Sequence, residues 1–113
     1  MTFLFICLAG GLGAVARYGL SGIAAGRLGS AGGTVVVNLL GSFLLGLVLG
    51  TLAGDLAAVL GIGFLGGFTT FSTAMVDATE SRRKVLLLAG TALGALLALA
   101  GGLALGETLV NLA

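Results

Sequence analysis

The sequence contains no histidine, no proline and a single cysteine, and only 8% of its 113 residues are charged. It also lacks paired carboxylates within any apolar segment and the Gly-Lys-Ser or Gly-Lys-Thr element that binds phosphates. The sequence therefore lacks the residues from which acid–base, metal and nucleotide sites are usually built. The lone Cys7 allows no internal disulfide and is most simply a small packing residue. We expect a protein that is not an enzyme.

Long apolar segments dominate the sequence instead. Apolar residues make up 58% of the chain and the mean hydropathy is +1.26, whereas about 25% of the residues in soluble globular domains are charged. A soluble fold would have almost no polar side chains to present to water, but in a bilayer the acyl chains solvate the outer face. This composition predicts a single integral membrane domain over residues 1–113.

The few charged residues mark the ends of the apolar segments. They are Arg17, Arg27, Asp55, Asp77, Glu80, Arg82, Arg83, Lys84 and Glu107. Segments 28–54, 56–76 and 85–106 each reach the roughly 20 residues that cross a hydrocarbon core of about 30 Å. A first span runs from Thr2 into the low 20s, with Arg17 in its second half, where a long side chain can extend to the interface or face a wet cavity. We expect an all-α membrane protein with four transmembrane helices.

Two other interpretations of these segments fit the sequence less well. The first segment ends in a triplet similar to a signal-peptide cleavage site, Ala14 to Ala16, but no Lys or Arg precedes the apolar run, as such signals normally require. A small multidrug-type transporter would need a carboxylate within a span to exchange protons with its substrate. All four acidic residues lie at the ends of the predicted spans.

Glycine is abundant, with 22 residues. In membranes, small residues spaced four apart form smooth helix faces that allow backbones to approach closely. Such spacing occurs at Gly22 and Gly26, at Gly46, Gly50 and Gly54, at Gly90 and Gly94, and at Gly102 and Gly106. We expect these glycines to pack helices together.

The third predicted span contains an unusual concentration of glycine and hydroxyl residues. They are Gly66, Gly67, Thr69, Thr70, Ser72 and Thr73. Adjacent glycines followed by hydroxyl residues weaken a helix, and freed backbone groups at this depth are tolerated only against protein, an ion or a water-filled cavity. We therefore predict that the third helix is broken near the membrane midplane. The alternative is a continuous helix whose hydroxyls bond to its own backbone.

Three motifs carry a family resemblance: GGLGAVARY at 10–18, GTVVVNLLGSFLLG at 33–46 and GGFTTFSTA at 66–74. In content and order they resemble the first-, second- and third-helix motifs of the Fluc (CrcB-type) fluoride channels. The resemblance implies a fluoride-specific channel subunit that exports fluoride passively from the cytoplasm across the bacterial inner (plasma) membrane and so reduces its toxicity. Its expected partners are fluoride and membrane lipid, with no nucleic acid.

The resemblance also implies an assembly. It predicts an antiparallel, dual-topology-type dimer with two fluoride pathways along its interface and a structural Na⁺, not transported, at its centre. By match to the family motif, the backbone carbonyls of Gly66 and Thr69 would bind the Na⁺. This assignment is chemically consistent, because a half-helix that ends at the midplane directs carbonyl oxygens toward the two-fold axis, and a hard cation prefers oxygen ligands.

Five residues match family positions along the fluoride pathway or in its vestibule. Asn38 offers amide donors, and Ser72 and Thr73 offer hydroxyl donors. Phe71 matches the first of two pore-lining phenylalanines, whose ring edges are electropositive. Arg17 would raise the anion concentration in a vestibule. Two alternatives stay open: an ordinary hydrogen bond between helices for Asn38, and anchoring of the helix end for Arg17.

The third motif departs from the family at Ala74, which stands where the second pore phenylalanine is expected. A homodimer would therefore lose an aromatic ring from both pathways. An even number of spans also places Arg27 and residues 82–84 on one side of the membrane, with no Lys or Arg opposite, which is a strong orienting signal. Both features favour a heterodimer with a paralogous, oppositely oriented subunit, in which this chain could be mainly structural. A homodimer is the alternative.

Overall fold

The computed structural model describes residues 1–69 and 82–113, with the backbone alone at residues 30, 31, 82–85, 87 and 88. All regular structure in these ranges is helical. The elements are α1 (Thr2–Thr51), α2 (Gly54–Ala57), the π-helix η1 (Ala58–Leu65), α3 (Gly66–Phe68) and α5 (Arg82–Leu112). The expected all-α architecture is confirmed for this part of the chain. Phe71, Ser72, Thr73 and Ala74 lie outside the described residues.

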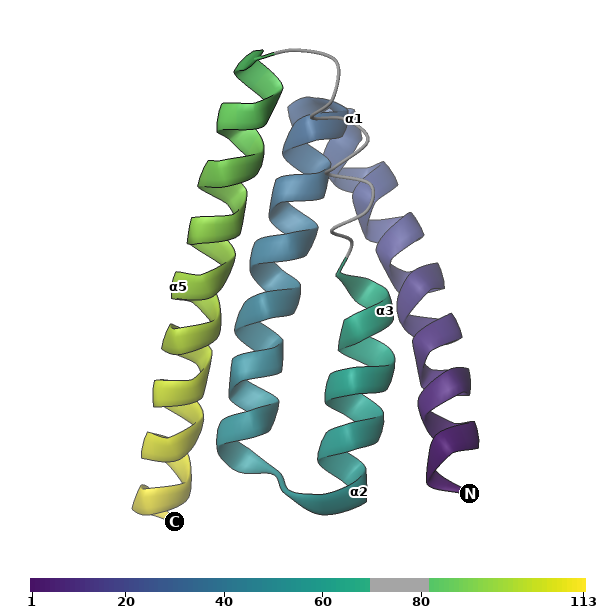
Figure 1. Ribbon diagram of the computed structural model, residues 1–113, viewed down its shortest axis with the longest axis vertical. Coiled ribbons are helices and arrows are strands. Elements are labelled where there is room, and N and C mark those ends of the chain that lie inside the picture. The colour runs from purple at the N-terminus through teal and green to yellow at the C-terminus, as the bar shows by residue number, and fades with distance from the viewer. Residues whose placement is uncertain (70–81) are drawn as a thin grey trace.

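Element α1 consists of two antiparallel helices that meet at Gly29 (Figure 1). Gly29 has φ 81° and ψ 169°, a backbone conformation that residues with a Cβ rarely adopt. The two halves, Thr2–Gly29 and Gly32–Thr51, are each long and apolar enough to cross a membrane. The helix continues beyond the low 20s, where the first span was predicted to end, and passes through Arg27 until Gly29 permits the turn.

The third apolar helical segment, Gly54–Phe68, is shorter than the other spans. It contains α2, η1 and α3, and it starts at Gly54, whose φ is 71°. The segment ends at Phe68, and Thr69 is extended, with φ −76° and ψ 147°. The rest of the predicted span 56–76 lies outside the described residues, so the broken third helix stays a prediction.

The last helix, α5, extends beyond the predicted segment 85–106 at both ends. Its segment Ala89–Leu112 is the third of three described helices that are long and apolar enough to cross a bilayer. Both termini and the connection at residues 52 and 53 lie at one end of the molecule (Figure 1). The turn at Gly29 and the start of α5 lie at the other end. This arrangement agrees with the prediction that Arg27 and residues 82–84 lie on one side of the membrane.

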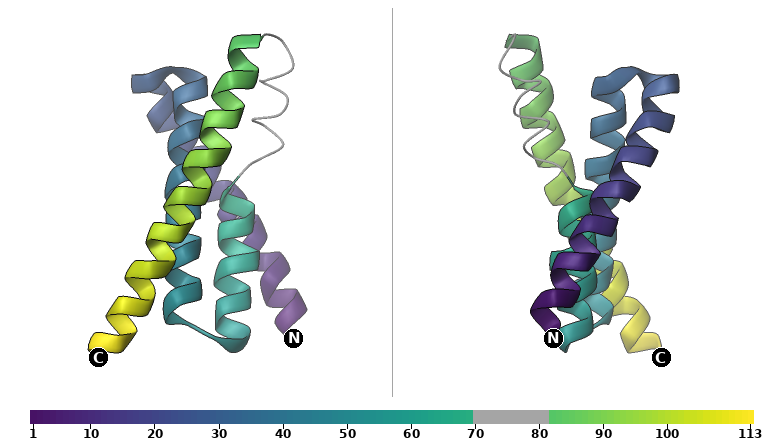
Figure 2. Two further views of the ribbon diagram at one scale, coloured as in Figure 1. Left: turned by 60° about the vertical axis from the view of Figure 1, so that its left-hand side comes forward. Right: turned by 90° about the vertical axis from the view of Figure 1, so that its right-hand side faces the viewer.

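The central helix of the molecule is Gly32–Thr51, and a larger share of it is buried than of the other two spans. Figure 2 shows α5 crossing one side of this helix, while Gly54–Phe68 and the first half of α1 lie on other sides. Among the described side chains, the buried apolar ones are Val37, Ala57, Leu65 and Phe68, whereas most large apolar side chains of Thr2–Gly29 and α5 are exposed. Lipid is the solvent that fits these exposed faces.

Glycine allows α5 to approach the central helix at backbone distance. A Cβ added at Gly50 would lie 2.6 Å from the carbonyl oxygen of Leu103, and one at Gly106 would lie 2.8 Å from that of Leu47. Cβ atoms added at Gly46 and Gly102 would also meet backbone atoms of the facing helix. These four glycines pack helices as predicted.

The packing prediction was wrong for other glycines within this chain. Among the described residues, Cβ atoms added at Gly22, Gly26 and Gly90 would find nothing within 4 Å, and Gly54 forms a turn instead. Four-residue spacing places glycines on one helix face, but it does not determine which face meets a neighbour. The third segment shows the contrast, because Gly63 and Gly67 pack against Ile6 and Gly10 of the first helix.

Candidate functional site

Asn38 lies on the central helix and is buried, with 8% of its surface exposed. Gly41 follows it by about one helical turn, so the two residues share a face of the helix. A Cβ at Gly41 would lie 2.5 Å from Cγ2 of Thr69 and 3.0 Å from Cδ1 of Phe68. The face that carries Asn38 is therefore directed toward the end of α3.

The end of α3 is defined by two hydrogen bonds to one carbonyl. The backbone N–H of Thr69 donates to the Leu65 oxygen at 2.9 Å, and the Thr69 hydroxyl donates to the same oxygen at 3.1 Å. The backbone carbonyls after Leu65 belong to the last turn of the helix. The last carbonyls of an α-helix have no N–H partner within the helix, and the negative end of the helix dipole lies there. Gly66 is in this turn and Thr69 comes directly after it.

These positions fit a carbonyl-bound monovalent cation. The described residues contain no cluster of three or more His, Cys, Asp or Glu side chains that could bind a metal. Backbone oxygens at a helix C-terminus are neutral, hard ligands of the type that Na⁺ accepts. The structure thus places Gly66 and Thr69 at a helix end, as the predicted Na⁺ site requires, and the ion itself stays a prediction.

Arg17 lies at about the same depth as Asn38. The first helix and the central helix are antiparallel, and a Cβ at Gly33 would lie 2.9 Å from the carbonyl oxygen of Ser21. Arg17 is four residues from Ser21 and Asn38 is five from Gly33, so both lie about 6–8 Å from that contact toward the terminal end. Arg17 is partly exposed, which fits a cation beside a wet vestibule and also fits the anchoring alternative.

Of the predicted site residues, the structure brings Asn38 and Thr69 to one helix interface and places Arg17 at a similar depth. Gly66 belongs to the same helix end and is exposed. Ser72, Thr73 and Phe71 lie outside the described part of the chain.

Sequence reasoning missed two features near this region. The π-helix η1 ends at Leu65, directly before Gly66, and short π-helical stretches are frequent at functional sites. No periodicity in the sequence signals it. The second feature is Thr91 of α5, which is buried. It was visible in the sequence as a hydroxyl in an apolar span, but nothing there showed which way it faces.

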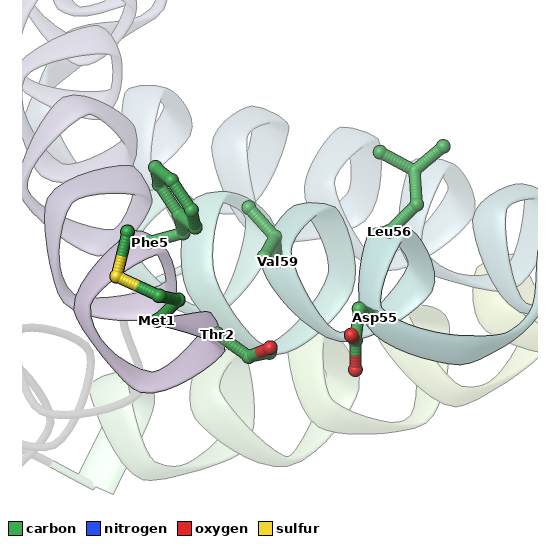
Figure 3. A pocket seen from close by; sticks show the side chains of 6 residues that line it. All are labelled: Met1, Thr2, Phe5, Asp55, Leu56 and Val59. Atoms are coloured by element: carbon green, nitrogen blue, oxygen red, sulfur yellow. The ribbon is translucent and has the colours of Figure 1, made fainter.

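A separate open pocket lies at the terminal end of the molecule, with a volume of about 450 Å³. Figure 3 shows its lining: Met1, Thr2, Phe5, Asp55, Leu56 and Val59. Asp55 is the one acidic side chain among them. None of the predicted site residues lines this pocket, so it is distinct from the Asn38 region.

Sequence comparisons identify the family. A family model described as CrcB-like protein, Camphor Resistance (CrcB), matches residues 4–108. The fluoride-specific ion channel FluC 2 of Cutibacterium acnes is 43% identical over 121 residues, covering 95% of this chain and 98% of the relative. The fluoride-specific ion channel FluC of a Thermus thermophilus strain is 43% identical over 112 residues, covering 92% and 85%. FluC 1 of Leifsonia xyli is 40% identical over 116 residues, covering 93% and 85%.

These matches confirm the resemblance drawn from the three motifs and the prediction that the chain is not an enzyme. Together with the apolar helices, they identify a multi-pass membrane protein. The chain belongs to the CrcB-like family, a family of fluoride ion channels.

Proposed function

We propose that this chain is a fluoride-specific channel subunit that releases fluoride from the cytoplasm passively across the bacterial inner membrane and so lowers its toxicity. The observation that carries the proposal is the burial of Asn38 on the helix face directed toward the end of α3. Family membership supports fluoride as the ion, because curated relatives are fluoride-specific ion channels.

Fluoride places particular demands on a pathway through the membrane. It is a small anion that holds water tightly, so it exchanges that water only for hydrogen-bond donors or positive potential. The Asn38 amide supplies two N–H donors, and Arg17 at similar depth supplies positive potential from the side of the vestibule. By match to the family, the hydroxyls of Ser72 and Thr73 and the ring edge of Phe71 extend this pathway.

Passive flow of fluoride is favoured because the described acidic residues lie far from the depth of Asn38 and Arg17. Asp55 is in the first turn of α2 and Glu107 is in the last turns of α5. Both belong to the terminal end of the molecule (Figure 1). A proton-coupled carrier needs a carboxylate within its transport path.

We further propose an antiparallel dimer with a structural Na⁺ at its centre. The carbonyls of Gly66 and Thr69 from this subunit, and the corresponding carbonyls of its partner, would surround the ion on a two-fold axis. The end of α3 before Thr69 supports this arrangement, because the carbonyl groups at a helix C-terminus carry the negative end of the helix dipole. The ion supplies the positive charge that keeps these carbonyl groups together and would not cross the membrane.

The distribution of basic residues favours a fixed orientation of this subunit. Arg27, beside the Gly29 turn, and residues 82–84, at the start of α5, belong to the same end of the molecule (Figure 1). The positive-inside rule puts this end in the cytoplasm and the termini outside. An oppositely oriented paralogue would then complete the dimer. Ala74 supports the same pairing, since a partner could provide the ring that this chain lacks. A homodimer with dual insertion is the alternative assembly, and a mainly structural role in a heterodimer is the alternative function.

The test of the function is ion efflux from liposomes. The purified protein, together with its paralogue if the genome encodes one, should release fluoride down its gradient much faster than chloride and without a proton gradient. Equal efflux of the two anions, or a requirement for a proton gradient, would overturn the proposal. Empty liposomes provide the background rate.

A further inference from the structure

The glycines of the motif at residues 10–18 differ in what they contact. Gly13 is buried, and a Cβ added there would meet the carbonyl oxygen of Phe64 and lie 3.0 Å from the backbone nitrogen of Phe68. Gly11 is exposed, and a Cβ added there would meet no described residue within 4 Å. The absence of a side chain therefore brings the first helix to backbone distance from the third segment at Gly13, and not at Gly11.

The contact at Gly13 lies beside the proposed Na⁺ site. Phe64 and Phe68 are two residues before and two residues after Gly66. A second contact of the same kind adjoins it, because a Cβ added at Gly67 would lie 2.9 Å from the carbonyl carbon of Gly10. The backbone of the first helix thus supports the last turn of α3 on both sides of Gly66 in the sequence.

Gly66 itself lies on an open face of the third segment. It is exposed, and the described atom nearest to a Cβ added there is the carbonyl oxygen of Gly61 in the same segment, at 3.8 Å. Another side of the helix end is covered, since Phe68 and Thr69 lie against Gly41 of the central helix. The end of α3 is therefore held by two helices of its own chain and is open at the residue whose carbonyl is proposed to bind the ion.

We propose that Gly13 is a positioning residue for the Na⁺ site, because the close approach that it permits determines where the carbonyls of Gly66 and Thr69 lie. This inference rests on the structural Na⁺ of the proposed function. Backbone carbonyls cannot follow an ion as flexible side chains can, so a displaced helix end changes the distances between the ion and its ligands.

Alanine at position 13 would displace the helix end. A Cβ at Gly13 would lie 2.8 Å from the carbonyl carbon of Phe64, and carbon atoms pack best at about 3.5–4.0 Å. The last turn of α3 would therefore have to move by roughly 1 Å. Changes behind the ligands of a metal ion typically lower its affinity about 10- to 100-fold.

The experiment measures thermal unfolding of the complete dimer in detergent, with the paralogue present if the chain requires one. Na⁺ replaces a large organic cation at constant ionic strength. Stabilisation by a bound ion appears once its concentration exceeds the dissociation constant, so the Na⁺ concentration at which the melting temperature begins to rise measures the affinity of the site. Gly13→Ala should raise this onset concentration about 10- to 100-fold. A loss of packing alone lowers the melting temperature at every Na⁺ concentration and leaves the onset unchanged.

Two alanine variants are matched controls. Gly11→Ala adds the same methyl group to the same helix at a position without a described neighbour. Gly102→Ala disturbs a backbone contact of the same kind between α5 and the central helix, on a different side of that helix from α3 (Figure 2). Gly102→Ala should lower the melting temperature. Both controls should keep the onset concentration within about twofold of the unmodified protein, because distant sites act independently.

Two outcomes would overturn the role of Gly13. A lower melting temperature for Gly13→Ala with an unchanged onset concentration would show a packing role alone. A rise of the same size in Gly102→Ala would show that the onset follows general stability. If Gly13→Ala does not assemble, Gly63→Ala replaces it, because a Cβ at Gly63 would lie 2.8 Å from the carbonyl oxygen of Ile6 in the same interface. An unchanged onset concentration in Gly63→Ala would overturn the inference in the same way.

The unmodified protein separates this inference from the proposals on which it rests. If Na⁺ stabilises the unmodified protein and the onset concentration of Gly13→Ala is unchanged, the role of Gly13 alone is overturned. An unmodified protein that gains no stability from Na⁺ overturns the proposed ion and this inference with it. The release of fluoride from liposomes tests the channel function independently of both.

Discussion

The contact between α5 and the central helix predicts opposite effects for two adjacent glycines. Gly101 and Gly102 are neighbours in α5, yet a Cβ at Gly101 would find no described residue within 4 Å. A Cβ at Gly102 would meet the backbone of Phe43 and lie 2.9 Å from the nitrogen of Leu47. Alanine at either position adds the same methyl group to the same helix. Only Gly102→Ala should disturb the packing.

The size of the effect follows from these contacts. Carbon atoms pack best at about 3.5–4.0 Å, so the two helices would have to separate by at least about half an ångström at Gly102. Overpacking of this kind typically costs about 1–3 kcal/mol, and the separation would also weaken the adjacent contacts at Gly46, Gly50 and Gly106. At Gly101 the higher helix propensity of alanine should give up to about 1 kcal/mol of stabilisation.

Thermal unfolding in one detergent would measure the difference between the two variants. A gap of about 1–4 kcal/mol corresponds to a difference on the order of 10 °C in melting temperature for a chain of this size. Gly101→Ala should melt at or slightly above the unmodified protein, and Gly102→Ala well below it. Melting temperatures within about 2 °C of each other would show that the backbone contact at Gly102 does not exist in the assembled protein.

Three further predictions concern the site and the assembly. Asn38→Ala should reduce fluoride efflux about tenfold or more while the dimer stays assembled, because hydrogen bonds to a charged group contribute about 1.5–3 kcal/mol; Thr51→Val, which alters an exposed hydroxyl on the same helix, is the control. Efflux from Asn38→Ala equal to that of the control would refute the donor role. Exchange of Na⁺ for a larger cation should lower efflux or dimer stability, because clustered carbonyls without their ion are costly to bury. Unchanged efflux and an unchanged dimer after exhaustive Na⁺ removal would argue against a structural ion. In a Cys7→Ser background, a thiol placed at the C-terminus should react only from outside and one beside Lys84 only from the cytoplasm, under the positive-inside rule. Reaction of both thiols from both sides would rule out a fixed orientation.

Several features could be predicted from the sequence because they depend on composition and spacing. The apolar segments identified four helical segments, and the motif around Asn38 identified the buried amide. The spacing of Gly46 with Gly50 and of Gly102 with Gly106 identified a close helix contact. Each of these features follows from a local pattern that lipid and close packing restrict to few structures.

Helix ends were harder to predict because charged residues mark the membrane boundary and do not stop a helix. Arginine and glutamate are good helix formers, so the first helix continues through Arg27 and α5 continues through Glu107. The turn forms where Gly29 permits a positive φ. The π-helix η1 escaped prediction for a related reason, because it reflects a change in backbone hydrogen-bond register and leaves no clear pattern in the side chains.

The chemistry of the proposed fluoride site around Asn38 also explains why fluoride flow should be passive. The amide of Asn38 neither gains nor loses a proton near neutral pH, so it cannot link fluoride movement to a proton gradient. The described carboxylates, Asp55 and Glu107, lie at the terminal end of the molecule, away from this site (Figure 1). A pathway built from neutral donors beside the positive charge of Arg17 lowers the free-energy cost of removing water from an anion. It does not couple the movement of that anion to the gradient of a second ion. Net fluoride movement must then follow the electrochemical gradient of fluoride itself, which is outward when the ion accumulates in the cytoplasm.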